Sequence, residues 1–496
     1  MFFLLTKSCA GGAVNFQTIS ALGATGSSVA LGANLAQQVL FRSGYRLGSD
    51  ATPGQELGVG IEVSAAGDQI TVTSDFAGRE PIFFSRCAGG FTVSNSFAVL
   101  ISCLKEAGQP VTPHQAVIDA QSSDSWIFET AAFHSTMVEG VQICPASHFV
   151  RISMAAGAVQ IVKQDAGALE HGYEDGLDQT ATYLRSCLKL LLENHEFPIL
   201  SLSGGQDSRI LLAAAMSLDS PARKNLLLHS IKSQSEEYAI VEKIAKKYGF
   251  PLNVYPQKTR VVKLEPESAA RRWILANLGV CFRNNYSDKY LVETNAILIR
   301  GGQVHASYYP IVLRKWLRDI RRVSEQKYLL YSGLMTDSAL PNLQVTLDSH
   351  YQFFRYRFHY GLTGYAASIG PLTVDPLINP FYERLATLLD FDARESGNLC
   401  RDLCNMMEPD VLSFGFAKGK NVTGAAGAEI PQQVRRSPAS AFVPMTFSNP
   451  GPAKAEAATG QSSKVYPHQI VDAAIFKDMT VSQVKKFNCD YIFGQR

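Results

Sequence analysis

The sequence predicts a chain of two folded parts. The first is a β-rich sandwich of the α+β class, and the second is an α/β domain with a doubly wound parallel sheet and a helical C-terminal part. Three observations predict this organisation. Short alternating segments separated by turns fill the first 165 residues. From about residue 170, buried strands alternate with helical patterns. A strand, a glycine turn and a helix follow one another between Phe197 and Ala215.

The β-rich part is read from its alternation of apolar and polar residues. Leu57–Ser64 and Gln69–Ser74 alternate and are rich in β-branched residues, so they predict a hairpin. A helix is expected over Phe97–Ala107. A turn followed by another strand pair is expected over Gly140–Ile152. Taken alone, these elements indicate a structural sandwich and no catalysis.

Length, charge and composition exclude several classes of protein. A chain of 496 residues is long enough for two or three domains, each with its own core. The net charge of +2 leaves no electrostatic footprint for nucleic acid. No run reaches the ~18 apolar residues of a membrane span, and Met1–Cys9 lacks the basic start of a signal peptide. The nine dispersed cysteines favour a reducing compartment, so we expect the cytoplasm.

The second part begins with a helical pattern over 167–194, which leads into a short buried strand at Ile199–Leu202. The next residues, Ser203-Gly204-Gly205, form a flexible turn, and a helix is expected over Arg209–Met216. A strand, a turn of small residues and a helix N-terminus together make a phosphate site, because unpaired backbone N–H groups and the helix dipole point at the ligand. A glycine turn that merely enters a core helix is the alternative.

Side chains of this segment add to the predicted phosphate site. Ser203 and Ser208 supply hydroxyl donors. Asp207 is a carboxylate beside the predicted phosphates, and its simplest role is that of a ligand to Mg²⁺. The candidate ATP-binding residues of this segment are Ser201, Leu202, Ser203, Gly204, Gly205, Asp207 and Ser208.

Strands and helices continue to alternate after the turn. A second strand is expected over Lys224–Ile231, a helix over Ser235–Lys247 with Ser235 as its cap, a third strand over Leu252–Tyr255 and a fourth over Asn295–Arg300. Alternation of this kind predicts a parallel sheet, which binds ligands at the carboxyl ends of its strands.

The string Ser-Gly-Gly-Gln-Asp-Ser, from Ser203 to Ser208, resembles the pyrophosphate loop of the N-type ATP pyrophosphatases. These enzymes cleave ATP between the α and β phosphates and activate a substrate as an adenylate. Asp75–Phe84 and Phe91–Leu100 are similar to two stretches of the glutaminase-type domain that precedes the synthetase domain in asparagine synthetase. The chain therefore resembles the asparagine synthetase and β-lactam synthetase group. This resemblance implies an Ntn-hydrolase-like sandwich followed by an ATP-pyrophosphatase synthetase domain.

The resemblance has one informative gap in the first part. Relatives with glutaminase activity use the thiol of the second residue, whereas position 2 is Phe2 here. A thiol elsewhere cannot have the α-amine as its adjacent base. We therefore expect that the sandwich hydrolyses no glutamine and is structural.

The resemblance also implies further site residues. Ile231, at the end of the second strand, would flank the adenine, and Gly301-Gly302 would form a second loop against ATP. Relatives carry acids in this second loop, but no Asp or Glu occurs between Asn295 and Asp319. His305 stands there instead, as a base, a neutral ligand or a scaffold residue.

Two more segments complete the expected site. Lys418 fits best the lysine that stabilises charge on the phosphates in relatives, and Lys420 lies close to it. Tyr351–Tyr360 is dense in aromatic residues, which favours core packing over a substrate pocket. Gly370–Asn379 resembles the family turn that precedes a helix.

The expected domains are a glutaminase-like part over 1–165, a synthetase part over 170–430, a flexible linker or lid over 431–465, and a C-terminal helix over 466–496 that packs on the synthetase part. The helix itself is expected around Val471–Phe487.

The expected function is that of a ligase that uses ATP and Mg²⁺, forms AMP and pyrophosphate, and joins a small-molecule or peptide carboxylate to an amine without glutamine. It belongs to specialised biosynthesis in this interpretation, and a homodimer is left open. A non-catalytic relative that binds nucleotide or serves as a scaffold is the first alternative. Sulfur transfer to tRNA is the second, and it needs a basic surface and cysteine pairs that the sequence lacks.

Overall fold

The computed structural model describes most of the chain. The described residues are 2–8, 13–19, 25–31, 35–42, 45–48, 57–87, 90–122, 126–164, 172–254, 260–282, 286–287, 289–293, 296–302, 354, 357–358, 372–389, 393–394, 396–417, 446–448, 476 and 479–494. The fold is mixed α/β, with several antiparallel sheets and one parallel sheet. Among the described residues, no helix is both long and apolar enough to cross a membrane.

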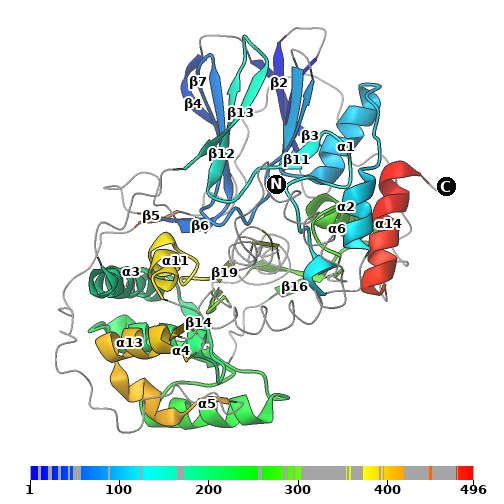
Figure 1. The fold of residues 1–496 in the computed structure, drawn as a ribbon. Helices are drawn as coiled ribbons and strands as arrows, with labels where there is room; N and C mark the ends of the chain where they lie inside the picture. Colours follow the sequence, from blue (N-terminus) through cyan, green and yellow to red (C-terminus); the bar gives the residue numbers. More distant parts are fainter. Residues whose placement is uncertain are drawn as a thin grey trace.

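Two antiparallel sheets face each other at the N-terminal end of the chain (Figure 1). One has the order β11-β9-β10-β1-β2-β3 and the other has the order β13-β12-β8-β7-β4. The strands are β1 (Phe2–Lys7), β2 (Val14–Ile19), β3 (Thr25–Leu31), β4 (Leu35–Arg42), β7 (Ile61–Gly67), β8 (Gln69–Ser74), β9 (Phe83–Cys87), β10 (Gly90–Ser94), β11 (Val141–Ile143), β12 (His148–Ser153) and β13 (Ala158–Lys163).

The sandwich forms because its strands place every second side chain in one shared core. In β8, Ile70 and Val72 are buried while the residues between them are half-buried. They meet Phe3 and Phe16 from the other sheet in a single apolar cluster. The predicted hairpin is confirmed as β7 and β8, which pair in antiparallel register.

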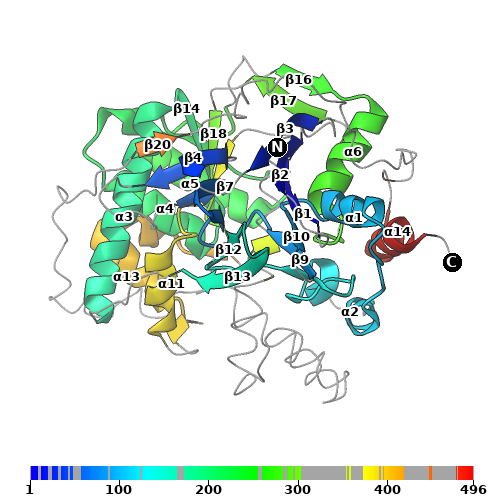
Figure 2. The same cartoon turned by 90° about the horizontal axis from the view of Figure 1, so that it is seen from above.

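Helices cover the outer side of the sheet that contains β1. They are α1 (Phe97–Glu106), α2 (Gln115–Gln121), α6 (Pro266–Asn277) and α14 (Val481–Phe493), and Figure 2 shows them side by side. Trp273 of α6 packs 4.9 Å from the ring of Phe476 and 6.1 Å from that of Phe487. The backbone N–H of Gly279 donates to Asn488 Oδ1 at 2.7 Å. The last helix thus packs on α6, in a cluster that also contains residues of α1 and α2.

The expected bounds of the last helix were wrong. The helix begins at Val481, ten residues after the expected start. Thr480 and Gln483 cap it with a reciprocal pair of hydrogen bonds, the capping box. The apolar periodicity before Val481 therefore does not mark the helix start, and the Thr-Val-Ser-Gln string does.

A parallel sheet forms the core of the second part, with the strand order β15-β14-β18-β19. Its strands are β14 (Phe197–Ser201), β15 (Leu227–His229), β18 (Ala296–Ile299) and β19 (Leu372–Val374). A parallel bridge between Leu228 and Leu252 adds a neighbour beyond β15. The next strand of this sheet in the chain, β15, pairs with one edge of β14, and the later strand β18 pairs with its other edge. The order reverses between β14 and β18, which is where open parallel sheets bind ligands.

Helices pack on this sheet and bury its apolar side chains in one large cluster. They are α3 (Tyr173–Asn194), α4 (Gln206–Met216), α5 (Ser235–Tyr248), α11 (Pro380–Thr387) and α13 (Asn398–Met407), with the short 3₁₀ helices η2 (Pro221–Asn225) and η4 (Pro409–Phe414). The expectation that Ser235 caps α5 is wrong, since the N-cap residue is Gln234 and Ser235 is the first helical residue. Short strands β16 (Arg260–Lys263) and β17 (Lys289–Glu293) pair beside α6.

Two details of the described chain differ from the expectations. Thr446–Ser448, in the segment expected to be a linker, forms strand β20, which pairs with β5 (Tyr45–Gly48); β5 also pairs with β6 (Leu57–Val59). Cys87 is disulfide-bonded, whereas the other described cysteines are free thiols. A dispersed, odd number of cysteines therefore did not exclude a disulfide.

Glu383 in α11 supplies a pH-dependent contribution to stability. Burial raises the pKa of its carboxyl group from 4.5 to about 7, against an opposing effect of Arg384. Because the folded state holds this proton more tightly, the contribution is complete below pH 4.5 and is lost as the pH rises through 7. We expect Glu383→Gln to be about 1–2 kcal/mol more stable than the native chain at pH 8 and no more stable at pH 4.5. Guanidinium unfolding at both pH values measures the difference.

Glu139→Gln is the control for this prediction, because Glu139 is an exposed residue in a turn. As a substitution on the surface, it should change the free energy of unfolding by less than about 0.5 kcal/mol. A gain for Glu383→Gln that is equal at pH 4.5 and pH 8 would contradict the buried, proton-binding role of Glu383.

Candidate functional site

The first loop of the site follows β14 and leads directly into α4. The backbone N–H of Leu202 donates to His229 O at 2.8 Å, so sheet pairing continues one residue past the strand. The helix begins at Gln206, three residues earlier than the sequence predicts, because Gly205 is extended (φ −90°, ψ 174°) and serves as N-cap. Gly205 has no side chain with which to cap the first-turn amides, so these amides face the loop.

Two serine hydroxyl groups fix the shape of this loop. Ser208 Oγ accepts from the backbone N–H of Ser203 at 3.1 Å and lies 3.1 Å from Ser203 Oγ. Ser203 Oγ in turn accepts from the backbone N–H of Gly205 at 3.1 Å. These hydrogen bonds between the serine hydroxyls and the loop backbone hold the loop in a compact turn. Asp207 lies in the first turn of α4. Negative charge is favoured at this end of a helix.

The second loop, Gly301-Gly302, lies against the first. A Cβ atom on Gly301 would lie 2.7 Å from the Cβ of Asp207 and 2.9 Å from the backbone nitrogen of Ser208. Gly302 has a φ of +77°, and a Cβ there would lie 3.4 Å from the Cβ of Asp375. Only glycine permits this approach. The structure thus brings together the two loops that the sequence separates by about ninety residues.

A third segment reaches the first loop from the end of η4. The backbone N–H of Ala417 donates to Gly204 O at 3.0 Å, and a Cβ on Gly204 would lie 2.6 Å from the Cβ of Ala417. Glu237, from the first turn of α5, approaches the same position, with its Cγ 3.3 Å from it. Lys418 follows Ala417 in the chain and lies outside the described residues, as His305 does.

Arg209 fastens this third segment to α4. Its side chain is fully buried, donates to Val411 O at 2.6 Å and Gly415 O at 3.0 Å, and stacks 4.8 Å from the ring of Phe416. Burial lowers the pKa of the guanidinium. A buried cation four residues after Gly205 thus binds carbonyl oxygens of the 411–415 segment, and in doing so it places Ala417 beside Gly204.

We expect Arg209→Met to destabilise the fold by about 2 kcal/mol, because it leaves two buried carbonyl oxygens without donors. It should also loosen Ala417 from Gly204, which hydrogen exchange of the 409–417 peptide detects. Arg223→Met is the matched control, since Arg223 binds Met216 O and Leu218 O at the far end of α4. If both variants leave exchange at 409–417 unchanged, Arg209 does not hold this segment.

The carboxyl end of β15 presents apolar side chains to solvent. Ile231 is 52% exposed, and Val254, after the neighbouring Leu252 bridge, is 51% exposed. Asn253 holds the two chain ends together, since it accepts from the N–H of Ser230 at 2.9 Å and donates to Ser230 O at 3.1 Å. Two exposed aliphatic side chains at adjacent strand ends suit a flat, apolar ring.

Other predicted site residues contribute through the backbone or not at all. Leu202 is 2% exposed, so its side chain belongs to the core and only its backbone lies at the loop. Ser201 is the last residue of β14. Among the described residues, no group of three or more His, Cys, Asp or Glu side chains could hold a metal, so Asp207 is a single candidate ligand. The described aromatic residues Phe354 and Phe358 are buried, as expected for core packing.

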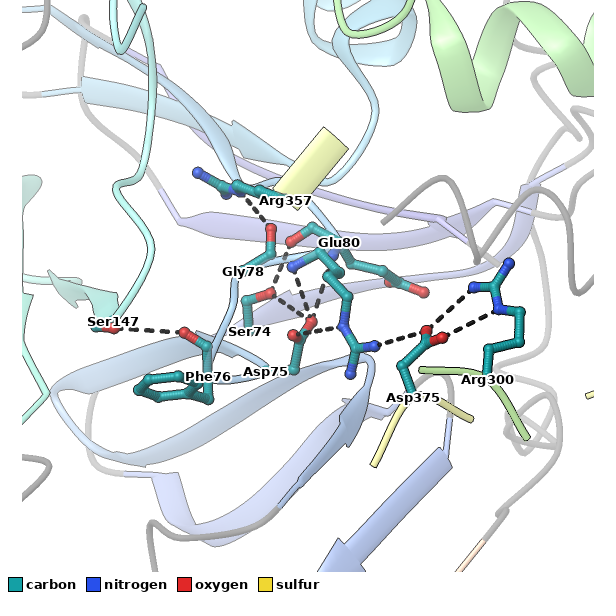
Figure 3. A network of polar contacts seen from close by, with 10 residues as sticks. Ser74, Asp75, Phe76, Gly78, Glu80, Ser147, Arg300, Arg357 and Asp375 are labelled. Atoms are coloured by element: carbon teal, nitrogen blue, oxygen red, sulfur yellow. Dashed lines mark hydrogen bonds and ion pairs between the residues drawn. The ribbon is translucent and has the colours of Figure 1, made fainter. Parts of the chain in front are cut away.

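A row of charged side chains beside the second loop, with Arg300 half-buried at one end, is not apparent from the sequence (Figure 3). Arg79 Nε donates to Asp75 Oδ1 at 3.2 Å, and its Nη1 lies 3.4 Å from Asp375 Oδ2. Arg300 grips the same Asp375 carboxylate from the other side, at 3.0 and 3.1 Å. Arg357 donates to the carbonyl oxygens of Gly78 and Cys144 nearby. The two acids of this row, Asp75 and Asp375, lie in the two turns that the sequence had singled out.

Comparison with known proteins adds no family to these observations. No protein-family model matches the chain. A search of curated proteins also finds no match. The function is therefore argued from the geometry and chemistry of the two glycine loops.

Proposed function

We propose that this protein is an ATP-dependent, AMP-forming ligase that adenylates a carboxylate and couples it to an amine. The observation that carries the proposal is the meeting of two glycine loops at the point where the strand order reverses. Ser203–Ser208 lies there at the N-terminus of α4, and Gly301 approaches it within van der Waals distance. Such a site favours a polyanion, because helix N–H groups and serine hydroxyls converge on it.

The nucleotide has a natural orientation in this site. The triphosphate would lie at the N-terminus of α4, where Asp207 would hold Mg²⁺. The adenine would rest on Ile231 and Val254, the two exposed aliphatic side chains at the neighbouring strand ends. Lys418 follows Ala417 in the chain, and we propose it as the residue that neutralises charge on the phosphates.

The proposed reaction takes two steps. A carboxylate oxygen attacks the α-phosphorus of ATP, and the bond to pyrophosphate breaks. The amine nitrogen then attacks the acyl carbon, AMP leaves, and the amine gives up one proton as the amide forms. The protein contributes mainly by holding the reactants in line and by neutralising charge on the phosphates.

Glutamine is not part of the proposed reaction. Phe2 begins β1 and pairs with Ile19, in the position where a glutaminase would carry its thiol. We propose that the sandwich is an Ntn-hydrolase-like domain kept for its structure, and that the amine arrives as ammonia, as a second substrate or as part of the same molecule.

Hydroxylamine trapping tests the ligase proposal without knowledge of the natural amine. The native chain is incubated with Mg·ATP, hydroxylamine and a panel of amino-acid and peptide carboxylates, and hydroxamate, AMP and pyrophosphate are measured. We expect all three products in equal amounts for at least one carboxylate class. ATP binding without AMP formation across the panel would favour the alternative, a nucleotide-binding protein without catalysis. The absence of any acid between Asn295 and Asp319 is the observation that favours this alternative.

A further inference from the structure

The row of charged side chains in Figure 3 joins the sandwich to the second loop. Its four members alternate in sign along the row, Asp75, Arg79, Asp375 and Arg300, so that the row is neutral overall. The first two belong to the turn after β8 and the last two to the ends of β19 and β18. The side chains of Asp75 and Arg79 are 4% and 2% exposed, that of Asp375 is fully buried, and that of Arg300 is 29% exposed.

The two acids are held in different ways. Asp75 is held by its own turn, because its Oδ2 also accepts from the backbone N–H groups of Arg79 at 3.0 Å and Glu80 at 3.4 Å. Asp375 has two guanidinium groups as its hydrogen-bond partners, one from each part of the molecule. A buried carboxylate that loses one of its cations is strongly destabilised. The orientation of Asp375 therefore depends on Arg79.

Asp375 packs against Gly302 of the second loop. Arg300 continues the pairing of β18 with β19, since its backbone N–H donates to Val374 O at 2.9 Å, and Gly301 follows it. A Cβ on Gly302 would touch the Cβ of Asp375 at 3.4 Å, whereas a Cβ on Gly301 would meet Asp207 and Ser208. The second loop is thus enclosed between the charged row on one side and the first turn of α4 on the other.

We propose that Arg79, a residue of the sandwich, is a positioning residue for the nucleotide site. Through Asp375 and Arg300 it holds Gly301-Gly302 against Asp207 and Ser208. This inference rests on the proposed function as far as nucleotide is concerned, but the position of the loop can be measured without nucleotide. The sandwich, which lacks a glutaminase thiol, would then help to position the second loop of the nucleotide site.

The test compares the full native chain with Arg79→Met, Arg79→Lys and the double variant Asp75→Asn/Arg79→Met. The double variant removes one charge of each sign and leaves Asp375 and Arg300 as a neutral pair, so it carries the test if Arg79→Met alone fails to fold. Hydrogen exchange at the amides of 300–302 and the dissociation constant of Mg·ATP are measured for each. Arg42→Met is the matched control, since Arg42 pairs with Glu62 in the same part of the chain and is 37% exposed.

We expect amide exchange in the second loop to rise at least ~10-fold in both methionine variants, and Mg·ATP affinity to fall by ~10-fold. Arg79→Lys should recover part of both effects, and Arg42→Met should change neither. A folded double variant with native exchange and native affinity would overturn the proposal. If exchange rises but the native chain binds no ATP, the positioning role stands and the proposed function fails.

Discussion

Mg·ATP at a hundred times its dissociation constant should raise the free energy of unfolding of the native chain by about 2.7 kcal/mol, and that of Asp207→Ala by nothing measurable. Asp207 lies in the first turn of α4, at the end of the helix where the triphosphate would bind. Without a metal between them, this carboxylate and the phosphates would repel each other. Thermal unfolding with and without Mg·ATP measures the difference directly.

Asp119→Ala is the control for this experiment, because Asp119 is an exposed acid on α2, far along the chain from both loops. It should keep the full stabilisation by Mg·ATP. Retention of the shift in Asp207→Ala would show that another group binds the metal. Absence of a shift in the native chain at millimolar Mg·ATP would remove the basis of the ligase proposal.

Gly301→Ala should lower Mg·ATP affinity by about 10- to 100-fold, which is about 1.4–2.7 kcal/mol. The added Cβ would lie 2.7 Å from the Cβ of Asp207 and 2.9 Å from the backbone nitrogen of Ser208. Backbone atoms cannot rotate away as the end of a side chain can, so the two loops must separate. Isothermal titration of Mg·ATP, alongside a denaturation curve, separates this effect from unfolding.

Gly172→Ala is the matched control, since a Cβ at Gly172 would meet nothing within 4 Å and its φ is −71°. It should leave nucleotide affinity unchanged, with at most about 1 kcal/mol lost at the start of α3. Native affinity in Gly301→Ala would mean that the close contact between the loops is unnecessary for binding.

The sequence predicts best what is decided locally. The strand Ile199–Leu202 is predicted within two residues of β14, because a short apolar run beside a glycine turn has few other interpretations. The start of α4 was missed by three residues, since extended backbone at Gly205 lets Gln206 begin the helix before the apolar pattern appears. Local polar signals, such as Thr480 and Gln483 at α14, marked a helix start better than apolar periodicity did.

What the sequence could not supply is the pairing of groups that lie far apart in the chain. Arg79 and Asp375 are 296 residues apart, and nothing in either turn specifies the other. The sequence alone predicts an ordinary charged helix residue at Arg209. Its side chain is instead fully buried, donates to the carbonyl oxygen of Gly415 and stacks on the ring of Phe416. Partners of buried charges are set by the packing of whole domains, which residue spacing does not encode.

The position of α14 has a consequence for biosynthesis. Phe487, Tyr491 and Ile492 pack in the same cluster as residues of α1, α2 and α6, whose own segments precede them by hundreds of residues. About 200 residues separate Asn277, the end of α6, from Val481, and a ribosome adds them in about 10–40 s at 5–20 residues per second. During that interval the nascent chain carries the apolar side chains of α1, α2 and α6 that α14 covers in the folded state. Chaperones should therefore engage this chain late in translation, and truncation before Val481 should yield aggregates even though the strands of the described sheets are already encoded.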